Sequence, residues 1–397
     1  MDSNDLAALD ANDPLAGFRD AFVLPEGVVY LAGNSLGALP KATSARLDQV
    51  VRQEWGASIV RGWTEHGWID APARVGGKIS RLIGAEPDEV IVADSTSVDL
   101  FKLIVAALSA APQRRTLLGV VGEFPTDIYV AQGALEALGG GRRLQLVERG
   151  ALEDAIGNDT ALLLLSHAHY KTAELWDMAA ITARAHAAGA LALWDLSHST
   201  GAAEVDLNAA QADLAVGCGY KYLSGGPGAP AYLFVARRHQ DRLVSPLSGW
   251  MGHERPFDFA DGYAPADGVR RFLCGTPPIL SLVALEAGVD LMLQADPAAL
   301  WRKARRLGDV FLELAATHCP ALEPACPGPG RLRGGHVAFR HVRAAEIHEA
   351  LVERGVIGDV RPPDLLRFGL SPLSVSYGDV RRAVQALEEV MGLVARM

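Results

Sequence analysis

Residues 212–235 read ADLAVGCGYKYLSGGPGAPAYLFV, two apolar runs separated by a turn that carries Lys221. The first run ends at Gly219, the second begins near Ala229, and glycines and prolines fill the segment between them. Runs that are apolar throughout are typical of strands buried on both faces of a sheet. The stretch therefore predicts two buried strands, with a lysine placed where the first one ends.

Similar apolar runs recur upstream, and segments of helical length lie between them. The predicted strands are 89–94, 115–121, 143–148, 160–169, 191–199, 212–219 and 229–236. The predicted helices are 95–111, 126–139 and 175–190, the last closed by Gly189. Buried strands that alternate with helices predict an α/β fold, with a mainly parallel sheet of seven-stranded type flanked by helices.

The C-terminal part has a different pattern and predicts a smaller α+β domain. Its predicted strands are 334–341, 356–361 and 365–372, its helices are 343–355 and 378–395, and 326–335 is a loop rich in glycine and proline. A chain of 397 residues has room for two domains. We place a large domain at 46–280 and a small domain at 281–397, and we expect residues 1–45 to pack with the small domain.

Composition and charge narrow the classes of function. The formal net charge is −10, which argues against a general nucleic-acid or membrane-surface binder. The four cysteines (Cys218, Cys274, Cys319 and Cys326) lack CxxC and zinc-ligand spacing, so we expect reduced thiols and no metal site. No apolar run approaches the roughly 18 residues of a membrane helix, and residues 1–18 lack a signal-peptide pattern. We expect a cytoplasmic protein with a small-molecule partner, and neither a nucleic acid nor a membrane.

The ends of two predicted strands carry polar residues that could bind a cofactor. Sheets of this kind bind ligands at the carboxyl ends of their strands. Asp195 and His198 lie at one predicted strand end, and Lys221 follows another. A carboxylate that keeps a pyridine nitrogen protonated and an amine that binds an aldehyde are the pair that pyridoxal phosphate requires. The spacing therefore favours pyridoxal phosphate as the cofactor, with Lys221 as nucleophile and base.

Several segments together resemble one family, kynureninase. They are GNSLGALP (33–40), EFPTD (123–127), WDLSHSTGA (194–202), the stretch 205–235, and GTPPIL (275–280). The resemblance runs from about residue 30 to the C-terminus. It implies a homodimeric pyridoxal-phosphate enzyme of the aspartate-aminotransferase fold, fold type I. The GNSLG turn together with GYKYLSGGPGAP is the specific part, and Tyr232 stands where the family pattern has phenylalanine.

The resemblance implies a set of cofactor-binding residues. Lys221 carries the Schiff base, Asp195 pairs with the ring nitrogen, and Phe124 stacks on the ring. The full set is Thr96, Ser97, Phe124, Pro125, Thr126, Asp127, Ser166, Asp195, His198, Tyr220, Lys221, Trp250 and Thr276.

Each of these residues also has a structural interpretation. Thr96 and Ser97 begin a predicted helix, whose free N–H groups suit a phosphate but would equally suit a plain N-cap. Pro125 would end a strand, and Thr126 would cap the next helix. Trp250 and Thr276 match positions that reach the phosphate in the partner subunit; core packing and a turn are the alternatives.

The substrate-binding residues implied by the resemblance are Arg367, Ser35 and Trp63. Arg367 lies in an otherwise apolar strand, where an arginine needs an anionic partner. A substrate α-carboxylate held by the guanidinium fork and a structural salt bridge both satisfy that need. Trp63 suits an aromatic wall for an aryl substrate, with His66 and Trp68 nearby, and core packing is the alternative.

The implied reaction is hydrolysis of L-kynurenine to anthranilate and L-alanine by cleavage of the Cβ–Cγ bond. Lys221 is the expected catalytic base, and Tyr220 is the candidate acid–base group. Hydrolysis of 3-hydroxykynurenine stays open, as does the role in tryptophan catabolism or NAD biosynthesis.

Other members of the superfamily compete with this interpretation. A cysteine desulfurase would need a reactive cysteine, for which Cys319 and Cys326 are candidates, and an aminotransferase would share Lys221, Asp195 and Arg367. A non-catalytic regulator that binds pyridoxal phosphate is the alternative from another class.

Overall fold

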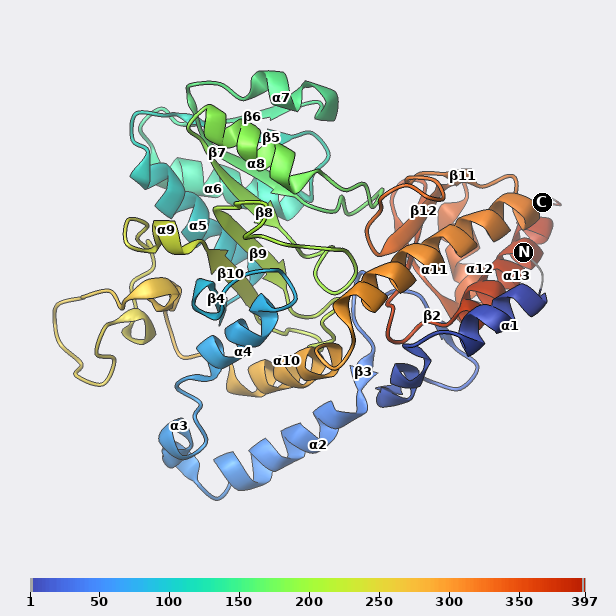
Figure 1. Cartoon of the computed structure of the whole chain (residues 1–397), viewed down its shortest axis with the longest axis horizontal. Coiled ribbons are helices and arrows are strands. Elements are labelled where there is room, and N and C mark those ends of the chain that lie inside the picture. Colours follow the sequence, from blue (N-terminus) through green and yellow to red (C-terminus); the bar gives the residue numbers. More distant parts are fainter. Residues whose placement is uncertain (1–2, 395, 397) are drawn as a thin grey trace.

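The computed structural model describes residues 3–394 and 396, which form a large and a small lobe (Figure 1). The large lobe contains a seven-stranded sheet in the order β4-β10-β9-β8-β7-β5-β6. Its strands are β4 (Val90–Ala93), β5 (Thr116–Val120), β6 (Arg143–Val147), β7 (Thr160–Ser166), β8 (Leu191–Asp195), β9 (Leu214–Cys218) and β10 (Ala231–Val235). Only β10 runs antiparallel to its neighbours in this sheet, which confirms the predicted mainly parallel sheet.

Helices cover both faces of this sheet. Because successive side chains of a strand point to opposite faces, each strand contributes to two cores. Val90 and Val92 of β4 enter one core, together with side chains of α4 (Ala71–Ser80), α8 (Met178–Ala187) and α10 (Ile279–Met292). Ile91 of β4 enters the other core, with α5 (Thr96–Ala110) and α6 (Pro125–Leu138). Burial on both faces explains why these runs are mainly apolar, with the exception of the edge strand β6, whose residues are exposed or half-buried.

The small lobe has a four-stranded antiparallel sheet in the order β11-β12-β15-β14. Its strands are β11 (Glu323–Pro324), β12 (His336–Arg340), β14 (Asp359–Arg361) and β15 (Leu365–Gly369), and its helices are α11 (Pro297–His318), α12 (Ala344–Glu353) and α13 (Tyr377–Val394). Residues 326–335 form the predicted loop between β11 and β12. Ala395, the last residue of the predicted final helix, lies outside the described residues.

The predicted strand 356–361 is split into two short strands with different partners. β13 (Val356–Ile357) pairs in parallel with β2 (Val29–Tyr30), whereas β14 joins the four-stranded sheet. Helix α1 (Ser3–Ala11) packs against α13, so Leu6 and Leu31 share the core of the small lobe. The N-terminal segment and the small lobe are therefore in direct contact.

The boundary between the lobes passes through the helical connection after the sheet. Leu282 and Leu285 of α10 belong to the core of the large lobe, and α10 packs against α2 (Lys41–Gln49) and α4. After α10, the first residue in the core of the small lobe is Leu307, within α11. The domain limits 1–45, 46–280 and 281–397 stay predictions.

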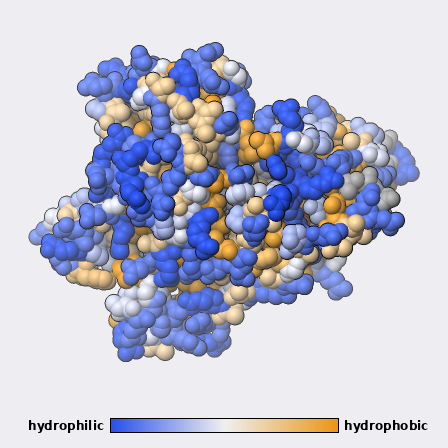
Figure 2. Space-filling view, in the orientation of Figure 1, coloured by the Kyte–Doolittle hydropathy of each residue, from blue (hydrophilic) through white to orange (hydrophobic). Residues whose placement is uncertain are grey.

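Short elements complete the chain, and its surface is mostly polar. They are β1 (Phe22–Val23) paired with β3 (Leu39–Pro40), and the helices α3 (Gly62–Glu65), α7 (Leu152–Ala155) and α9 (Arg237–Gln240). Figure 2 shows hydrophilic side chains over most of one face, with hydrophobic ones gathered where the two lobes meet. Among the described residues, no helix is both long and apolar enough to cross a bilayer.

Candidate active site

The carboxyl ends of four neighbouring parallel strands bring the predicted catalytic residues to one edge of the sheet. Ser166 and Asp195 end β7 and β8 and lie directly opposite each other in the register. Glu123 follows β5, and Lys221 follows β9, each three residues after the strand ends. Parallel strands end at the same edge, so the fold itself gathers these groups.

Lys221 occupies a tight turn after β9 and is almost completely buried. The turn is closed by hydrogen bonds from the Gly225 N–H to the Gly219 carbonyl (2.9 Å) and from the Ser224 N–H to the Lys221 carbonyl (2.8 Å). The GNSLG turn covers it, because the Gly37 N–H donates to the Tyr220 carbonyl at 2.8 Å. Two segments far apart in the sequence thus form one wall of the site.

Within the described part of the chain, the Lys221 ammonium has one hydrogen-bond partner, His198. The Lys221 Nζ lies 2.9 Å from the His198 Nε2. Burial, followed by the charge of Lys221, holds the pKa of His198 well below its usual value. His198 is therefore neutral and accepts this hydrogen bond, while its buried Nδ1 has no partner. This arrangement keeps the amine oriented and gives its proton an acceptor.

Three buried acids lie around the same strand ends. Burial raises the pKa of Glu123 to about 7. Burial, then the charges of Asp195 and Glu123, raise the pKa of Asp127 well above its usual value, and Lys221 opposes this. Asp195 accepts the Ser197 N–H at 2.8 Å. The negative charges of these neighbouring carboxylates repel one another, which favours their protonated forms. A bound cationic N–H group would reduce this repulsion.

Several buried polar atoms at this edge have no hydrogen-bond partner among the residues that the structure describes. They are Glu123 Oε2, Asp127 Oδ2, Ser166 Oγ and His198 Nδ1. Buried polar groups are normally paired, so a cluster of unpaired ones indicates a place for a polar ligand. A protonated pyridine nitrogen beside Asp195 and a ring hydroxyl or aldehyde near the other atoms would fit these donors and acceptors.

Aromatic side chains form one side of the site. The Lys221 Nζ lies 5.9 Å from the ring centroid of Phe124 and 5.8 Å from that of Tyr220. Phe124 meets Tyr170 edge to face, with ring centroids 5.2 Å apart. Burial, then electrostatic interactions with Cys218 and Asp195, raise the pKa of Tyr220, so its phenol stays protonated near neutral pH.

The turn before α6 differs from the sequence expectation in one detail. Thr126 was expected to cap this helix, but the helix begins at Pro125 and Phe124 occupies the N-cap position without a side-chain cap. Proline at the first helical position removes one N–H that would need a partner. The Phe124 ring lies at the site, with the Lys221 Nζ 5.9 Å from its centroid.

The arginine end of the site lies on the small lobe. Arg367 is completely buried, and its Nε donates to the Asp359 Oδ1 at 2.7 Å. Its Nη2 lies 3.3 Å from the Ser35 Oγ, so the two predicted substrate-binding residues meet. The charge of Arg367 also acts on His198, which connects this end electrostatically to Lys221.

Other predicted residues lie elsewhere or lack a contact with Lys221. Trp63 packs against Trp250, with ring centroids 6.1 Å apart, and Thr276 is exposed. Thr96 and Ser97 form the first turn of α5, which Ser95 caps. Within the described part of the chain, no hydrogen bond or ring contact joins these residues to Lys221, and their roles stay predictions.

Five residues near the site were not predicted as members of it. Glu123 lies inside the quoted EFPTD motif, and Asn34 lies inside GNSLG with both side-chain amide atoms buried and unpaired. His336 faces His198, with ring centroids 5.8 Å apart. Asp359 and Arg361 surround Arg367. For Asp359 and Arg361, the sequence signal was the pair of opposite charges in GDVR (358–361), close to an apolar strand that contains an arginine.

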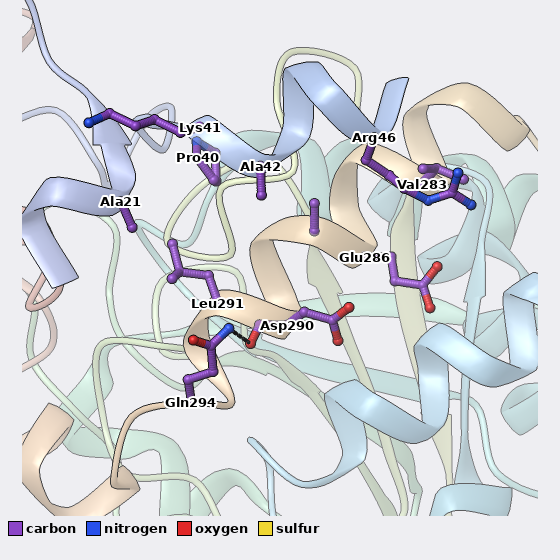
Figure 3. A pocket seen from close by; sticks show the side chains of 11 residues that line it. Ala21, Pro40, Lys41, Ala42, Arg46, Val283, Glu286, Asp290, Leu291 and Gln294 are labelled. Atoms are coloured by element: carbon purple, nitrogen blue, oxygen red, sulfur yellow. Dashed lines mark hydrogen bonds between the residues drawn. The ribbon is translucent and has the colours of Figure 1, made fainter. Parts of the chain in front are cut away.

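A cavity of about 440 Å³ lies away from this site, between α2 and α10 (Figure 3). Its charged lining residues are Lys41, Arg46, Glu286 and Asp290. Lys78 already pairs with Glu286 and Asp290, at 2.9 and 2.7 Å. Because Lys78 neutralises these two carboxylates, they are poorly suited to bind a charged ligand in the cavity.

Solved structures with a similar fold include a cysteine desulfurase and a protein with a covalently linked PLP cofactor. The cysteine desulfurase CsdA of Escherichia coli matches over 96% of this chain and 98% of its own, with a TM-score of 0.80 and 18% identity. A C-DES mutant with glycine covalently linked to its PLP cofactor matches over 98% and 99%, with a TM-score of 0.80 and 15% identity. At these identities the likeness establishes the fold.

Closer relatives are found among curated sequences. Kynureninase of Pseudomonas fluorescens is 47% identical over 395 residues, covering 98% of this chain and 95% of the relative. Kynureninase of Burkholderia mallei (strain SAVP1) is 45% identical over 391 residues, covering 97% and 94%. The family model for the kynureninase C-terminal domain matches residues 300–387. The resemblance seen in the motifs thus extends over nearly the whole length, and the chain belongs to the kynureninase family.

Proposed function

We propose that this protein binds pyridoxal phosphate and hydrolyses L-kynurenine to anthranilate and L-alanine. The observation that carries the proposal is the buried contact of 2.9 Å between Lys221 and His198, beside Asp195, at the carboxyl edge of the sheet. The identity of 45–47% to kynureninases over nearly the full length supports the reaction.

The residues present fit this cofactor. When bound, pyridoxal phosphate supplies an aldehyde that reacts with amines and a ring that withdraws electrons from the substrate α-carbon. Asp195 and Asp127 would hold the protonated ring nitrogen, and Phe124 would cover one face of the ring. The first turn of α5, with Thr96 and Ser97, offers free N–H groups and a positive helix end for the phosphate.

Two side chains, Lys221 and Tyr220, would carry out the proton transfers. The Lys221 amine is the base that can take the proton from the substrate α-carbon, and neutral His198 can hold the amine in position for it. Tyr220, whose phenol stays protonated, can donate a proton at the substrate carbonyl or β-carbon. Arg367 would hold the α-carboxylate, which fixes the α-carbon between these groups.

The dimer and the aromatic pocket are further parts of the proposal. Trp63 and Trp250 contact each other rather than Lys221, which is consistent with a shared role in the site of a second subunit. The exposed Thr276 would join them there. A cytoplasmic location, predicted from the sequence, also belongs to this proposal.

The cysteines help to discriminate against a desulfurase, whose fold this chain shares. A persulfide-forming cysteine needs an accessible thiolate. Burial raises the pKa of Cys319 to about 12 and also raises that of Cys326. The Cys326 Sγ accepts a hydrogen bond from the Ala338 N–H at 3.4 Å. Neither thiol is suited to attack a substrate sulfur.

The test is to mix the purified holoenzyme with L-kynurenine and to follow anthranilate fluorescence and the visible cofactor band together. We expect a cofactor band and anthranilate release, both lost in Lys221→Ala. Lys41→Ala, an exposed lysine on α2, is the matched control and should retain both. A cofactor band without anthranilate would refute the kynureninase activity, and the absence of any band would refute the cofactor site.

A further inference from the structure

We propose that Arg361 is a second arginine that binds the α-carboxylate of the substrate, and that Asp359 holds Arg361 and Arg367 in position for it. The inference rests on the proposed function, because it concerns an amino-acid substrate with a free carboxylate.

The sheet of the small lobe places these three charges on one face. β14 and β15 are antiparallel neighbours, and Asp359 lies directly opposite Arg367 in their register. Arg361 lies two residues further along β14, so its side chain leaves the same face. Ser35, from the GNSLG turn, approaches this face and lies 3.2 Å from the Arg361 Nη2. The cluster therefore joins the small lobe to the turn that covers Lys221.

Most donors of Arg367 are already occupied. A guanidinium carries five N–H groups. In Arg367 the Nε donates to Asp359, the Nη1 donates to the Tyr170 carbonyl, and the Nη2 serves both Asp359 and Ser35. About one N–H, on the Nη1, is left for a ligand. Arg367 alone cannot present a free two-pronged fork while Asp359 remains bound.

Arg361 has the free donors that Arg367 lacks. Among the described residues, only its Nη2 has hydrogen-bond partners, Asp359 and Ser35, both at 3.2 Å. Its Nε is buried without a partner, which costs free energy until an acceptor arrives. Its side chain is 39% exposed, so a ligand can reach it. The unpaired donors of the cluster are thus concentrated on Arg361, beside the last free N–H of Arg367.

The charge of the cluster favours an anion at this place. Two arginines and one aspartate leave one net positive charge. The charges of Arg367 and Arg361 both act on His198, the partner of Lys221, after the larger effects of burial and of Lys221 itself. A carboxylate held by the two arginines would therefore lie within electrostatic range of the amine that must meet the α-carbon.

The decisive experiment measures ligand binding to the holoenzyme without turnover. The change in the cofactor absorbance gives the Kd of L-alanine, which has the carboxylate, and of ethylamine, which lacks it. In Arg361→Met we expect the Kd of L-alanine to rise at least about tenfold, as a charge-assisted hydrogen bond is lost. The Kd of ethylamine should change less than about twofold, and Arg361→Lys should recover part of the loss.

The matched control is Arg340→Met, which removes an exposed arginine of the same sheet that pairs with Asp364. It should leave both Kd values unchanged. An unchanged Kd of L-alanine in Arg361→Met would overturn the inference, as would an equal weakening of both ligands, because the latter is the mark of a structural role. A wild-type protein that binds L-alanine but releases no anthranilate would refute the proposed reaction and leave this test valid.

Discussion

Replacing Glu123 by glutamine should stabilise the ligand-free protein at about pH 8 and leave its stability at pH 4.5 nearly unchanged. Glu123 follows β5, is 5% exposed, and has one carboxylate oxygen without a partner. Burial raises its pKa from 4.5 to about 7. The acid is therefore kept protonated in the fold over a range of pH in which it would ionise in the unfolded chain.

The sign of the effect follows from the protons bound in each state. Below pH 4.5 Glu123 is protonated in both states and costs nothing. Between pH 4.5 and about 7 the unfolded chain loses the proton while the folded protein keeps it, so the free energy of unfolding falls as the pH rises. The interval corresponds to about 3 kcal/mol at 1.36 kcal/mol per pH unit. Glutamine has no such proton to lose.

Urea unfolding of the apoprotein at pH 4.5, 6 and about 8 measures this difference. The gain of Glu123→Gln over the wild type should grow from near zero to about 3 kcal/mol across the series. Glu153→Gln, at an exposed position, is the matched control and should show no such growth. A gain in Glu123→Gln that is the same at pH 4.5 and pH 8 would show that ionisation of this side chain is not its cause.

Two further substitutions test a close packing contact at the site and a buried ion pair of the large lobe. Gly37→Ala would place a Cβ 2.2 Å from the Lys221 carbonyl, so we expect a lower Tm and loss of the cofactor band, whereas Gly133→Ala, with open space around it, should be tolerated. Lys102→Met would leave Asp94 and the buried Asp99 without their cation, and urea unfolding should show a loss of about 3 kcal/mol. Unchanged stability in Lys102→Met would show that these acids need no counter-charge.

Much of the large lobe was predictable because its strands are buried on both faces. All seven predicted strands exist, and their ends agree within three residues except that β8 ends at Asp195, four residues before the end of the predicted strand 191–199. The 160–169 run ends at Ser166 because the following residues leave the sheet, and Ala168 pairs with Leu175 in an isolated bridge instead. The antiparallel direction of β10 was not predictable, because it depends on the short turn after Lys221 rather than on the apolar pattern. A buried strand has the same apolar composition whether it runs parallel or antiparallel to its neighbours.

The site was predictable where it is local in sequence and less so where it depends on contacts between distant segments. Lys221, Asp195 and His198 stand at strand ends that a parallel sheet must bring together, and the structure does so. The contact of GNSLG with the Lys221 turn joins residues far apart in the chain, and only the family resemblance indicated it. The pairing of Trp63 with Trp250 had no local signal, since each looks like a core tryptophan in its own segment.

The second arginine shows what a strand register adds to a list of residues. Arg361 and Arg367 flank a short turn, so a hairpin between their strands was a possible expectation from the sequence. Its register decides which charges share a face: with Asp359 opposite Arg367, all three point the same way, whereas a slip by one residue would turn Asp359 and Arg361 to the other face. The same register occupies the fork of Arg367 and leaves donors free on Arg361. The different roles of the two arginines therefore depend on the register between β14 and β15. Substitutions that shift this register should abolish carboxylate binding even with both arginines present.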